Sequence, residues 1–365
     1  MTHSMTKEIS QWFLPGLQNV LPFESPEFLD FSRLHLNEGL PPSPLFNEIC
    51  KQTLDEMLNG AYSLNYYPFL SHPGLQEAFS NYLEVPENYI EVVGGSSEAL
   101  LIFGAGCYRE GKKVAYPRPS YYMYEKCIKI FGATGVPYSI PIPFNESQLL
   151  KELYSSSVTQ SDIAIFCNPN NPTGSCLSPD IIEDFIKNFS GLVIVDEAYQ
   201  EYSHLDGIPS LVKKTQTYKN LVVLRTLSKA WSAAGIRVAA VIAHPELLYQ
   251  IKKLRTYRLS SFSQFFADKL LRNYTSEMWE NVKKSNQLRI NFENNLRKIK
   301  NVEVFPTHTN FVFFQYPRAI QLEQILAHDQ KILIRNSFGN YLRISVLSES
   351  IHQEIIGAIH KLNDL

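Results

Sequence analysis

Between residues 46 and 243, short apolar runs alternate with longer amphipathic stretches, and this alternation restricts the chain to one class of fold. The apolar runs are Ile90–Val93, Val114–Tyr116, Ile163–Cys167, Leu192–Val195, Leu221–Leu224 and Val238–Ile242. The stretches with helical periodicity include Pro73–Leu83, Ser97–Cys107, Tyr122–Phe131 and Ser178–Phe189. Apolar runs separated by amphipathic helices are typical of parallel strands that are buried on both faces. The pattern therefore predicts an α/β fold with a mostly parallel central sheet sandwiched by helices.

The pattern changes after Pro245. Long helices are expected over Leu247–Leu254 and Phe262–Leu296, followed by three short strands and a closing helix, over Asn310–Phe314, Lys331–Ile334, Tyr341–Val346 and Ser348–Leu362. The first 45 residues are irregular and proline-rich, which predicts an arm that lies on another part of the molecule. We therefore expect a large domain over residues 46–245, and a smaller α+β domain built from residues 246–365 with the N-terminal arm, residues 1–45.

The net charge of the chain and the pattern of its cysteines argue against several classes of binding partner. The formal net charge is −2, which argues against a dedicated nucleic-acid binder. No apolar stretch reaches the ~18 to 20 residues needed to cross a bilayer, so no membrane partner is expected. The five cysteines are odd in number, widely spaced and without a C-x-x-C pair. This pattern favours reduced thiols in a cytoplasmic protein and argues against a metal site.

A lysine that follows a buried strand is the strongest candidate for chemistry. The run Leu221–Leu224 leads into Arg225-Thr-Leu-Ser-Lys229, and Arg237 follows eight residues later. A desolvated lysine can be a neutral amine and form a Schiff base with an aldehyde. The hydroxyls of Thr226 and Ser228, with the Arg237 guanidinium, suit a phosphate. A solvated surface turn would account for the same residues.

Three further motifs follow other predicted strands. Asn171 lies in Cys167-Asn-Pro-Asn-Asn171-Pro-Thr-Gly174, and its amide could donate to a phenolic oxygen, although an ordinary turn explains the prolines and glycine. Asp196 and Tyr199 follow Leu192–Val195, where a carboxylate could hold a protonated ring nitrogen or simply cap a helix. Ser96 and Ser97 follow two glycines and open a helix, which is either an anion site or a capped helix start.

Together the four motifs require one ligand that has an aldehyde, a phenolic oxygen, a basic ring nitrogen and a phosphate. Pyridoxal 5′-phosphate (PLP) has all four groups. The order and spacing of the motifs resemble the fold-type I PLP-dependent aminotransferases of class I/II, and most closely the histidinol-phosphate aminotransferases. The resemblance extends from Asn37-Glu38 to Leu342-Arg343-Ile-Ser.

The resemblance implies a role for each site residue. Lys229 would form the Schiff base with PLP, Asp196 would pair with the ring nitrogen, and Asn171 and Tyr199 would bind the phenolic oxygen. The phosphate ligands would be Ser96, Ser97, Thr226, Ser228 and Arg237. Tyr121 would stack on the ring, and Tyr67 would reach the phosphate of a neighbouring subunit in a homodimer. Arg343, Arg335 and Asn37 would lie at the substrate.

The implied activity is amino transfer between an amino acid, or an amino-alcohol phosphate such as histidinol phosphate, and a 2-oxo acid. Three departures from the family pattern concern the substrate: Gly39-Leu40 after Asn37-Glu38, the short segment from Arg335 to Arg343, and Val346-Leu347 where a glycine is usual. Two alternatives stay open. One is a PLP-dependent amino-acid or amino-acid-phosphate decarboxylase on the same fold, and the other is a non-catalytic PLP-binding effector module.

Overall fold

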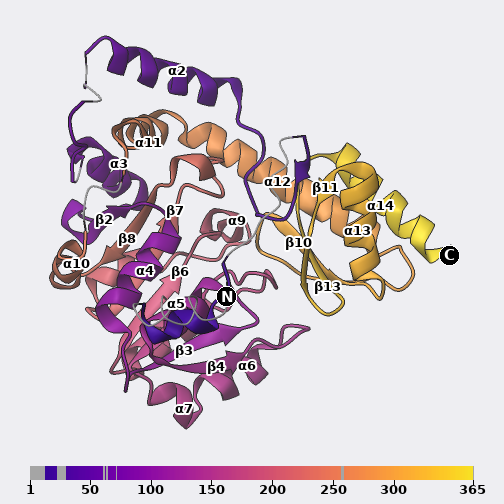
Figure 1. The fold of residues 1–365 in the computed structure, drawn as a ribbon, viewed down its shortest axis with the longest axis horizontal. Helices are drawn as coiled ribbons and strands as arrows, with labels where there is room; N and C mark the ends of the chain where they lie inside the picture. Colours follow the sequence, from indigo (N-terminus) through magenta and orange to yellow (C-terminus); the bar gives the residue numbers. More distant parts are fainter. Residues whose placement is uncertain are drawn as a thin grey trace, which may run out of the picture.

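A computed structural model describes residues 13–22, 30–60, 62, 65–70, 72–255 and 259–364. A seven-stranded sheet forms the centre of the larger part of the molecule (Figure 1). In spatial order its strands are β2 (Ile90–Val93), β8 (Ala239–Ala243), β7 (Leu221–Thr226), β6 (Leu192–Asp196), β5 (Ile163–Cys167), β3 (Lys113–Arg118) and β4 (Thr134–Ser139). β8 alone runs in the direction opposite to the other strands of this sheet, which confirms the predicted mostly parallel α/β fold.

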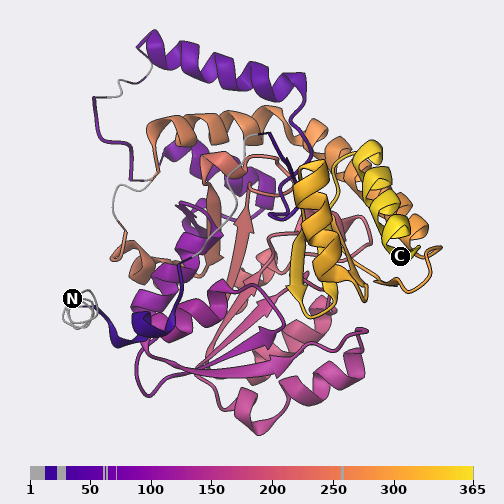
Figure 2. The same ribbon diagram turned by 45° about the vertical axis from the view of Figure 1, so that its right-hand side comes forward.

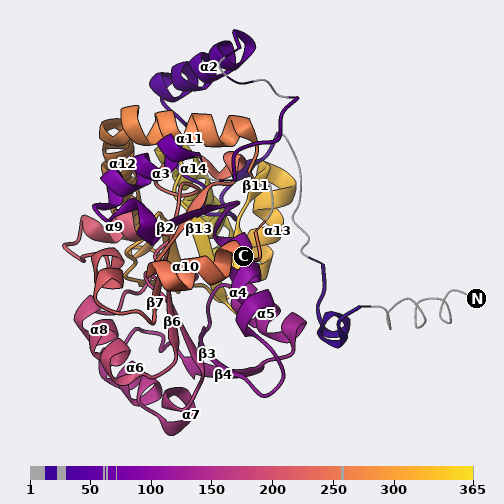
Figure 3. The same ribbon diagram turned by 90° about the vertical axis from the view of Figure 1, so that its left-hand side faces the viewer.

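Helices cover both faces of this sheet (Figure 3). One face packs against α4 (Ser96–Cys107), α5 (Met123–Phe131) and α10 (Pro245–Lys252). On the other face lie α3 (Pro73–Leu83), α6 (Glu146–Leu153), α7 (Ser156–Thr159), α8 (Pro179–Asn188), α9 (Gln200–His204) and α11 (Ser261–Asn273). The helix α2 (Pro44–Leu58) packs on the outer side of α11. Along β6, Ile194 belongs to the first face and Val193 and Val195 to the second, as the two-residue period of a strand requires.

A smaller sheet forms the other part of the molecule. Its order is β12 (Arg335–Phe338), β13 (Tyr341–Ser345), β10 (Phe311–Gln315) and β9 (Glu303–Phe305), all antiparallel. One face packs on the end of α12 (Thr275–Leu296) and on α13 (Ala319–Gln330) and α14 (Glu349–Asn363). In Figure 2 these helices lie on the outer side of the small sheet. Residues of the opposite face, such as Phe311 and Arg343, turn toward the large sheet's loops.

The N-terminal arm lies on both parts of the molecule. A 3₁₀ turn at Pro15–Asn19 packs against α5 so closely that a Cβ at Gly16 would lie 1.8 Å from the Lys129 carbonyl oxygen. Farther along, β1 (Ser32–Arg33) pairs in parallel with β11 (Ile332–Leu333) of the small part. Residues 1–12 and 23–29 of the predicted arm lie outside the described residues.

Several element predictions differ from the structure. The single helix expected over Phe262–Leu296 is two helices, α11 and α12, because the backbone leaves helical geometry at Tyr274. The helix α2 was not predicted, because only three of its 15 residues are buried and one of these, Thr53, is polar. The strand β4 was also missed, since it is an edge strand that contains Gly135 and Pro137 and buries only Tyr138.

The packing of α11 and α12 bears on the domain boundary. Phe266, Leu270, Met278 and Val282 belong to the hydrophobic core of the large sheet, whereas Phe292 and Leu296 belong to that of the small sheet. We propose on this ground that the large domain extends beyond residue 245 and that the division falls within α12.

Within the described residues, no helix combines the length and the apolar character that crossing a bilayer requires.

Candidate active site

The predicted motifs meet at the carboxyl edge of the large sheet. Asn171 follows β5, Asp196 ends β6, and Thr226 ends β7. These three strands are neighbours in the sheet, so their carboxyl ends lie together. Lys229 follows β7 by three residues. This is the edge at which open α/β sheets bind ligands.

Within the described residues, no carboxylate lies in hydrogen-bonding range of the amine of Lys229, whose side chain is half-buried. Its Nζ donates to the backbone carbonyl of Leu36 over 2.8 Å and lies 5.7 Å from the centre of the Tyr199 ring. Burial, together with the charges of Arg343 and Arg237, lowers the pKa of Lys229 from 10.5 to about 7. A substantial fraction of the amine is therefore neutral at physiological pH, as a nucleophile or a general base must be.

Asp196 is a buried carboxylate fixed by two donors. Its Oδ2 accepts from the Tyr124 hydroxyl over 2.9 Å, and its Oδ1 accepts from the Ala198 backbone N–H over 3.2 Å. Burial raises the pKa of Asp196, although both hydrogen bonds oppose the shift. The Asp196 carboxylate has the Lys229 amine as a nearby positive group. A protonated ring nitrogen of a ligand would supply a further positive charge to pair with this carboxylate.

The small sheet and the arm complete the site through Asn37 and Arg343. The Asn37 side chain donates to the Tyr199 hydroxyl over 2.8 Å and accepts from Ser345 over 3.1 Å. One Arg343 nitrogen donates to Asn171 Oδ1 over 2.5 Å, and another donates to the His35 carbonyl. The Arg343 Nε is buried without a hydrogen-bond partner. Arg343 therefore faces the sheet's carboxyl edge with donor capacity left for an anionic ligand.

A second set of donors forms a cradle for an anion. The Thr226 hydroxyl donates to Ser228 Oγ over 2.9 Å, and Arg237 reaches the same Ser228 Oγ at 3.5 Å. Gly95 precedes α4 with φ 95°, and a Cβ there would lie 2.4 Å from a guanidinium nitrogen of Arg237. Only glycine lets Arg237 approach the start of α4, where Ser96 and Ser97 lie. Helix N–H groups, hydroxyls and a guanidinium together fit a phosphate.

Tyr121 connects this cradle to the Asp196 side of the site. Its hydroxyl lies 3.0 Å from Ser97 Oγ, and its ring meets the ring of Tyr124 edge-on at 5.7 Å. Tyr124 is the residue that holds Asp196. The ring of Tyr121 therefore lies between the groups that would hold the two ends of a cofactor ring.

Two predicted residues differ from the others in their placement. Tyr67 is 79% exposed, so the structure does not bury it in a site of its own chain. Arg335 is exposed on β12, directly opposite Arg343 on β13 in the antiparallel register. Both arginines therefore project from the same face of the small sheet.

Sequence reasoning missed three contributors to the site: Tyr124, Ser345 and the backbone of residues 35–36. Tyr124 lies in the first turn of α5, three residues after Tyr121, and the run of tyrosines there is the signal that could have indicated it. The carbonyls of His35 and Leu36 leave no side-chain signal, because any residue type carries them.

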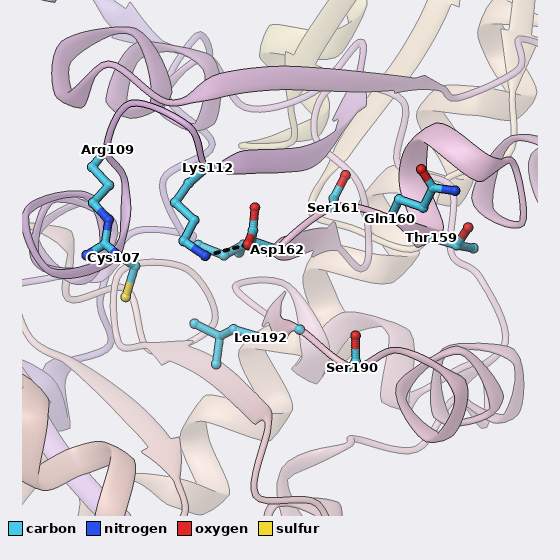
Figure 4. Close-up of a pocket in the computed structure, with 11 residues that line it drawn as sticks. Cys107, Arg109, Lys112, Thr159, Gln160, Ser161, Asp162, Ser190 and Leu192 are labelled. Atoms are coloured by element: carbon cyan, nitrogen blue, oxygen red, sulfur yellow. Dashed lines mark hydrogen bonds and ion pairs between the residues drawn. The ribbon is translucent and has the colours of Figure 1, made fainter.

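A cavity of about 510 Å³ lies at the other, amino-terminal edge of the large sheet. Figure 4 shows Lys112 and Asp162 joined across it, with a nitrogen–oxygen distance of 2.6 Å. Two of its charged lining residues thus form an ion pair with each other, and none of the predicted site residues lines it.

Comparison with known proteins identifies the family. The model of aminotransferase class I and II matches residues 33–359. A histidinol-phosphate aminotransferase of Thermoanaerobacter sp. (strain X514) is 31% identical over 338 residues, covering 90% of this chain and 93% of that protein. A relative with the same name from Chlorobium chlorochromatii is 29% identical and covers 90% of this chain and 88% of that protein.

Solved structures agree on the fold. The histidinol-phosphate aminotransferase of Sinorhizobium meliloti, solved with PLP, superposes with a TM-score of 0.82 at 20% identity, covering 96% of this chain and 98% of that one. An L-threonine-O-3-phosphate decarboxylase from Porphyromonas gingivalis reaches 0.79 at 19% identity, covering 92% and 100%. The decarboxylase shares the fold only, whereas the relatives with higher sequence identity are named as aminotransferases. The chain therefore belongs to the class I and II aminotransferases, and it is an enzyme that uses PLP.

Proposed function

We propose that this enzyme transfers the amino group of a donor with an anionic end, of the histidinol phosphate type, to a 2-oxo acid. The observation that carries the proposal is the Lys229 amine, placed among Asp196, Arg237 of the cradle and Arg343 of the small sheet, with Arg335 opposite Arg343 on the next strand. When bound, PLP supplies an electron sink for the bond pair released at the substrate carbon. The residues around it determine which bond reacts.

Each residue has a distinct task in this proposal. Lys229 holds the cofactor before substrate arrives, and its freed amine then removes and returns a proton at the substrate carbon that bears nitrogen. Asp196 keeps a proton on the cofactor's ring nitrogen. Tyr199, itself held by Asn37, and the amide of Asn171 hold the phenolic oxygen. The cradle of Ser96, Ser97, Thr226, Ser228 and Arg237 holds the phosphate, while Tyr121 supports the ring.

The paired arginines support an anionic donor. Burial lowers the pKa of Arg343 to about 10, so its guanidinium stays charged at neutral pH. One guanidinium suffices for one carboxylate or phosphate, because a fork of two N–H donors matches it. Arg335, exposed on the same face, offers the second positive charge for the far end of the donor.

We also propose that the working unit is a homodimer in the cytoplasm, with reduced thiols. The support is an apolar surface on α2 and the segment that follows it. Leu58 is 80% exposed, and large apolar side chains are exposed at Leu54, Tyr66, Tyr67, Phe69 and Leu70. Figure 2 shows α2 at the outer end of the molecule, beyond α11. An apolar set of this kind marks a protein–protein interface.

The cofactor assignment is tested by borohydride reduction of the loaded protein followed by peptide mapping. PLP should be fixed on Lys229, and a label on any other lysine contradicts the assignment.

The substrate assignment is tested with Arg343→Ala and Arg335→Ala against histidinol phosphate, dicarboxylic donors and neutral amino acids. Loss of a charged contact is worth ~1.5–3 kcal/mol, or about one to two decades in kcat/KM. Arg343→Ala should lower kcat/KM for every donor, whereas Arg335→Ala should lower it only for donors with an anionic far end. If Arg335→Ala leaves those donors unaffected, Arg335 has no part in substrate choice.

A further inference from the structure

A cluster of buried charges lies directly behind the candidate active site. Along β7, Leu224 packs on the α4–α5 face of the sheet, and Val223 packs on the opposite, α3 face. By the same alternation, Thr226 faces the cofactor site while Arg225 points to the α3 side. Along β6, Ile194 and Asp196 alternate in the same way with Val195 and Glu197. We define the rear charge cluster as Arg225, Glu197, Glu201 and Tyr82.

Hydrogen bonds and ion pairs hold this cluster together. Arg225 donates to Glu201 over 2.6 Å and lies 3.6 Å from Glu197. Tyr82, from α3, donates its hydroxyl to the same Glu201 oxygen over 2.8 Å. Glu197 accepts from Ser210 Oγ over 2.5 Å and from the Leu211 N–H over 2.7 Å. The three charged side chains are each at most 8% exposed.

Each charged member is a near neighbour in sequence of a residue at the cofactor site. Glu197 directly follows Asp196, and Arg225 directly precedes Thr226. Glu201 is two residues beyond Tyr199. The cluster therefore connects the turn after β6 with the end of β7, the two segments that carry Asp196, Tyr199 and Lys229.

Stability alone does not account for such a cluster. One guanidinium faces two buried carboxylates, and the Arg225 Nε is buried without a hydrogen-bond partner. Buried ion pairs are often no more stable than well-packed apolar side chains of the same volume. What the cluster does provide is fixed geometry, since a connected buried polar network permits few arrangements.

We propose that Arg225 is a positioning residue, which through Glu197 and Glu201 holds the turn after β6 and the end of β7 so that Asp196, Tyr199 and Lys229 meet the cofactor together. This inference rests on the proposed PLP site. It means that residues on the α3 face of the large sheet contribute to cofactor binding and turnover.

The test compares Arg225→Met with a control that removes an equally buried ion pair elsewhere. Arg289, on α12, lies 2.6 Å from Glu293, and both side chains are at most 7% exposed. Arg289→Met therefore matches the loss of a buried guanidinium without touching the cluster. For each variant, the measurements are the thermal midpoint of the apo protein, the Kd for PLP by titration of the apo protein, the absorption band of bound PLP, and kcat and KM separately.

Both variants should lower the thermal midpoint. Only Arg225→Met should also change the properties of the cofactor site. It should raise the Kd for PLP roughly tenfold and lower kcat roughly tenfold with little change in KM, as is common for supporting contacts behind a site. It should also shift the absorption band of bound PLP. Arg225→Lys, which keeps the charge, should recover part of the loss. Tyr82→Phe removes one hydroxyl from the cluster and, with the fold intact, should raise the Kd for PLP by a smaller factor.

The results separate this inference from the proposed function. If the unaltered protein does not take up PLP on Lys229, the proposed function fails. If it does, and Arg225→Met and Tyr82→Phe bind PLP and turn over like Arg289→Met, the function stands and the positioning role of Arg225 is overturned.

Discussion

At the scale of single residues, the pKa of Lys229 leads to a pH prediction. Because burial and the charges of Arg343 and Arg237 lower this pKa to about 7, the neutral fraction of the amine falls about tenfold per pH unit below that value. We expect the rate at which apo protein takes up PLP to rise about tenfold per unit up to pH ~7 and then to level off. Absorbance after mixing measures it, with free lysine as the control for titration of PLP itself.

Arg343→Gln supplies the matched variant for this measurement. Loss of the nearby cation should raise the pKa of Lys229, so the levelling of the uptake rate should move to higher pH. The Lys229 amine also affects the free energy of unfolding. Between pH about 7 and 10.5 the unfolded chain binds a proton that the folded chain has lost, so the free energy of unfolding increases with pH over this window. An uptake rate that still rises steeply at pH 9 would contradict the lowered pKa.

Sequence reasoning predicted which side chains the structure brings together better than it predicted their partners. Lys229, Asp196 and Asn171 could be located because each follows a buried apolar run, and the sheet brings those runs together. The partners of these residues come from far along the chain. Asn37 meets Tyr199 across 162 positions, and Leu36 meets Lys229 across 193. No local pattern specifies such pairings, because they depend on how the arm and the small sheet pack onto the large one.

At the scale of elements, the start of α4 leads to a second prediction. Gly95 has a positive φ, and a Cβ there would collide with Arg237 at 2.4 Å. Gly95→Ala should therefore displace Arg237 from the phosphate cradle and raise the Kd for PLP by roughly tenfold or more, equivalent to ~1.5 kcal/mol or more for a charged contact. Titration of the apo protein with PLP measures the Kd, and thermal unfolding measures the cost to the fold.

Gly111→Ala is the control for the strained backbone alone. Gly111 also has a positive φ, of 84°, but a Cβ there would meet no atom within 4 Å. Its replacement should cost about 1 kcal/mol of stability and leave the Kd for PLP unchanged. Equal Kd values for the two alanine variants would show that Gly95 serves the backbone and not the cradle.

The elements that sequence reasoning missed share a physical cause. Buried strands such as β6, which is apolar up to its final residue Asp196, are recognised from the sequence alone, and α3 was predicted at its observed bounds, Pro73–Leu83. By contrast β4, β9 and β12 bury few of their residues, so neither an apolar run nor an alternation marks them. Their place is determined by the neighbouring strands with which they pair.

At the scale of the whole molecule, the small sheet and the arm act as one cover over the large sheet's carboxyl edge. The arm pairs with β11 through β1 and then passes His35, Leu36 and Asn37 along the site. Arg343 reaches into the site from β13. The cover and the large sheet therefore both contribute polar contacts to the site. For this reason the sequence could suggest a division of the chain at residue 245, but it could not assign the site to either part alone.

The apolar surface of α2 predicts the oligomeric state. If it forms a dimer interface, Leu58→Glu should convert a dimer into a monomer in sedimentation experiments at micromolar concentration, because it would bury a charge without a partner. Leu21→Glu is the control, since Leu21 is 86% exposed and lies on the arm away from α2. A monomeric unaltered protein would contradict the interface.

Tyr67 allows the same interface to be tested through activity. If its exposed side chain completes the partner's site, Lys229→Ala and Tyr67→Ala subunits should both be weak on their own but should complement each other when mixed. Random exchange makes half of the dimers hybrid, each with one site that has both residues, so activity should approach about a quarter of the unaltered enzyme. If Tyr67 acted within its own chain, every site in the mixture would lack one of the two residues. Activity would then stay at the average of the two parent variants, however long the subunits were exchanged.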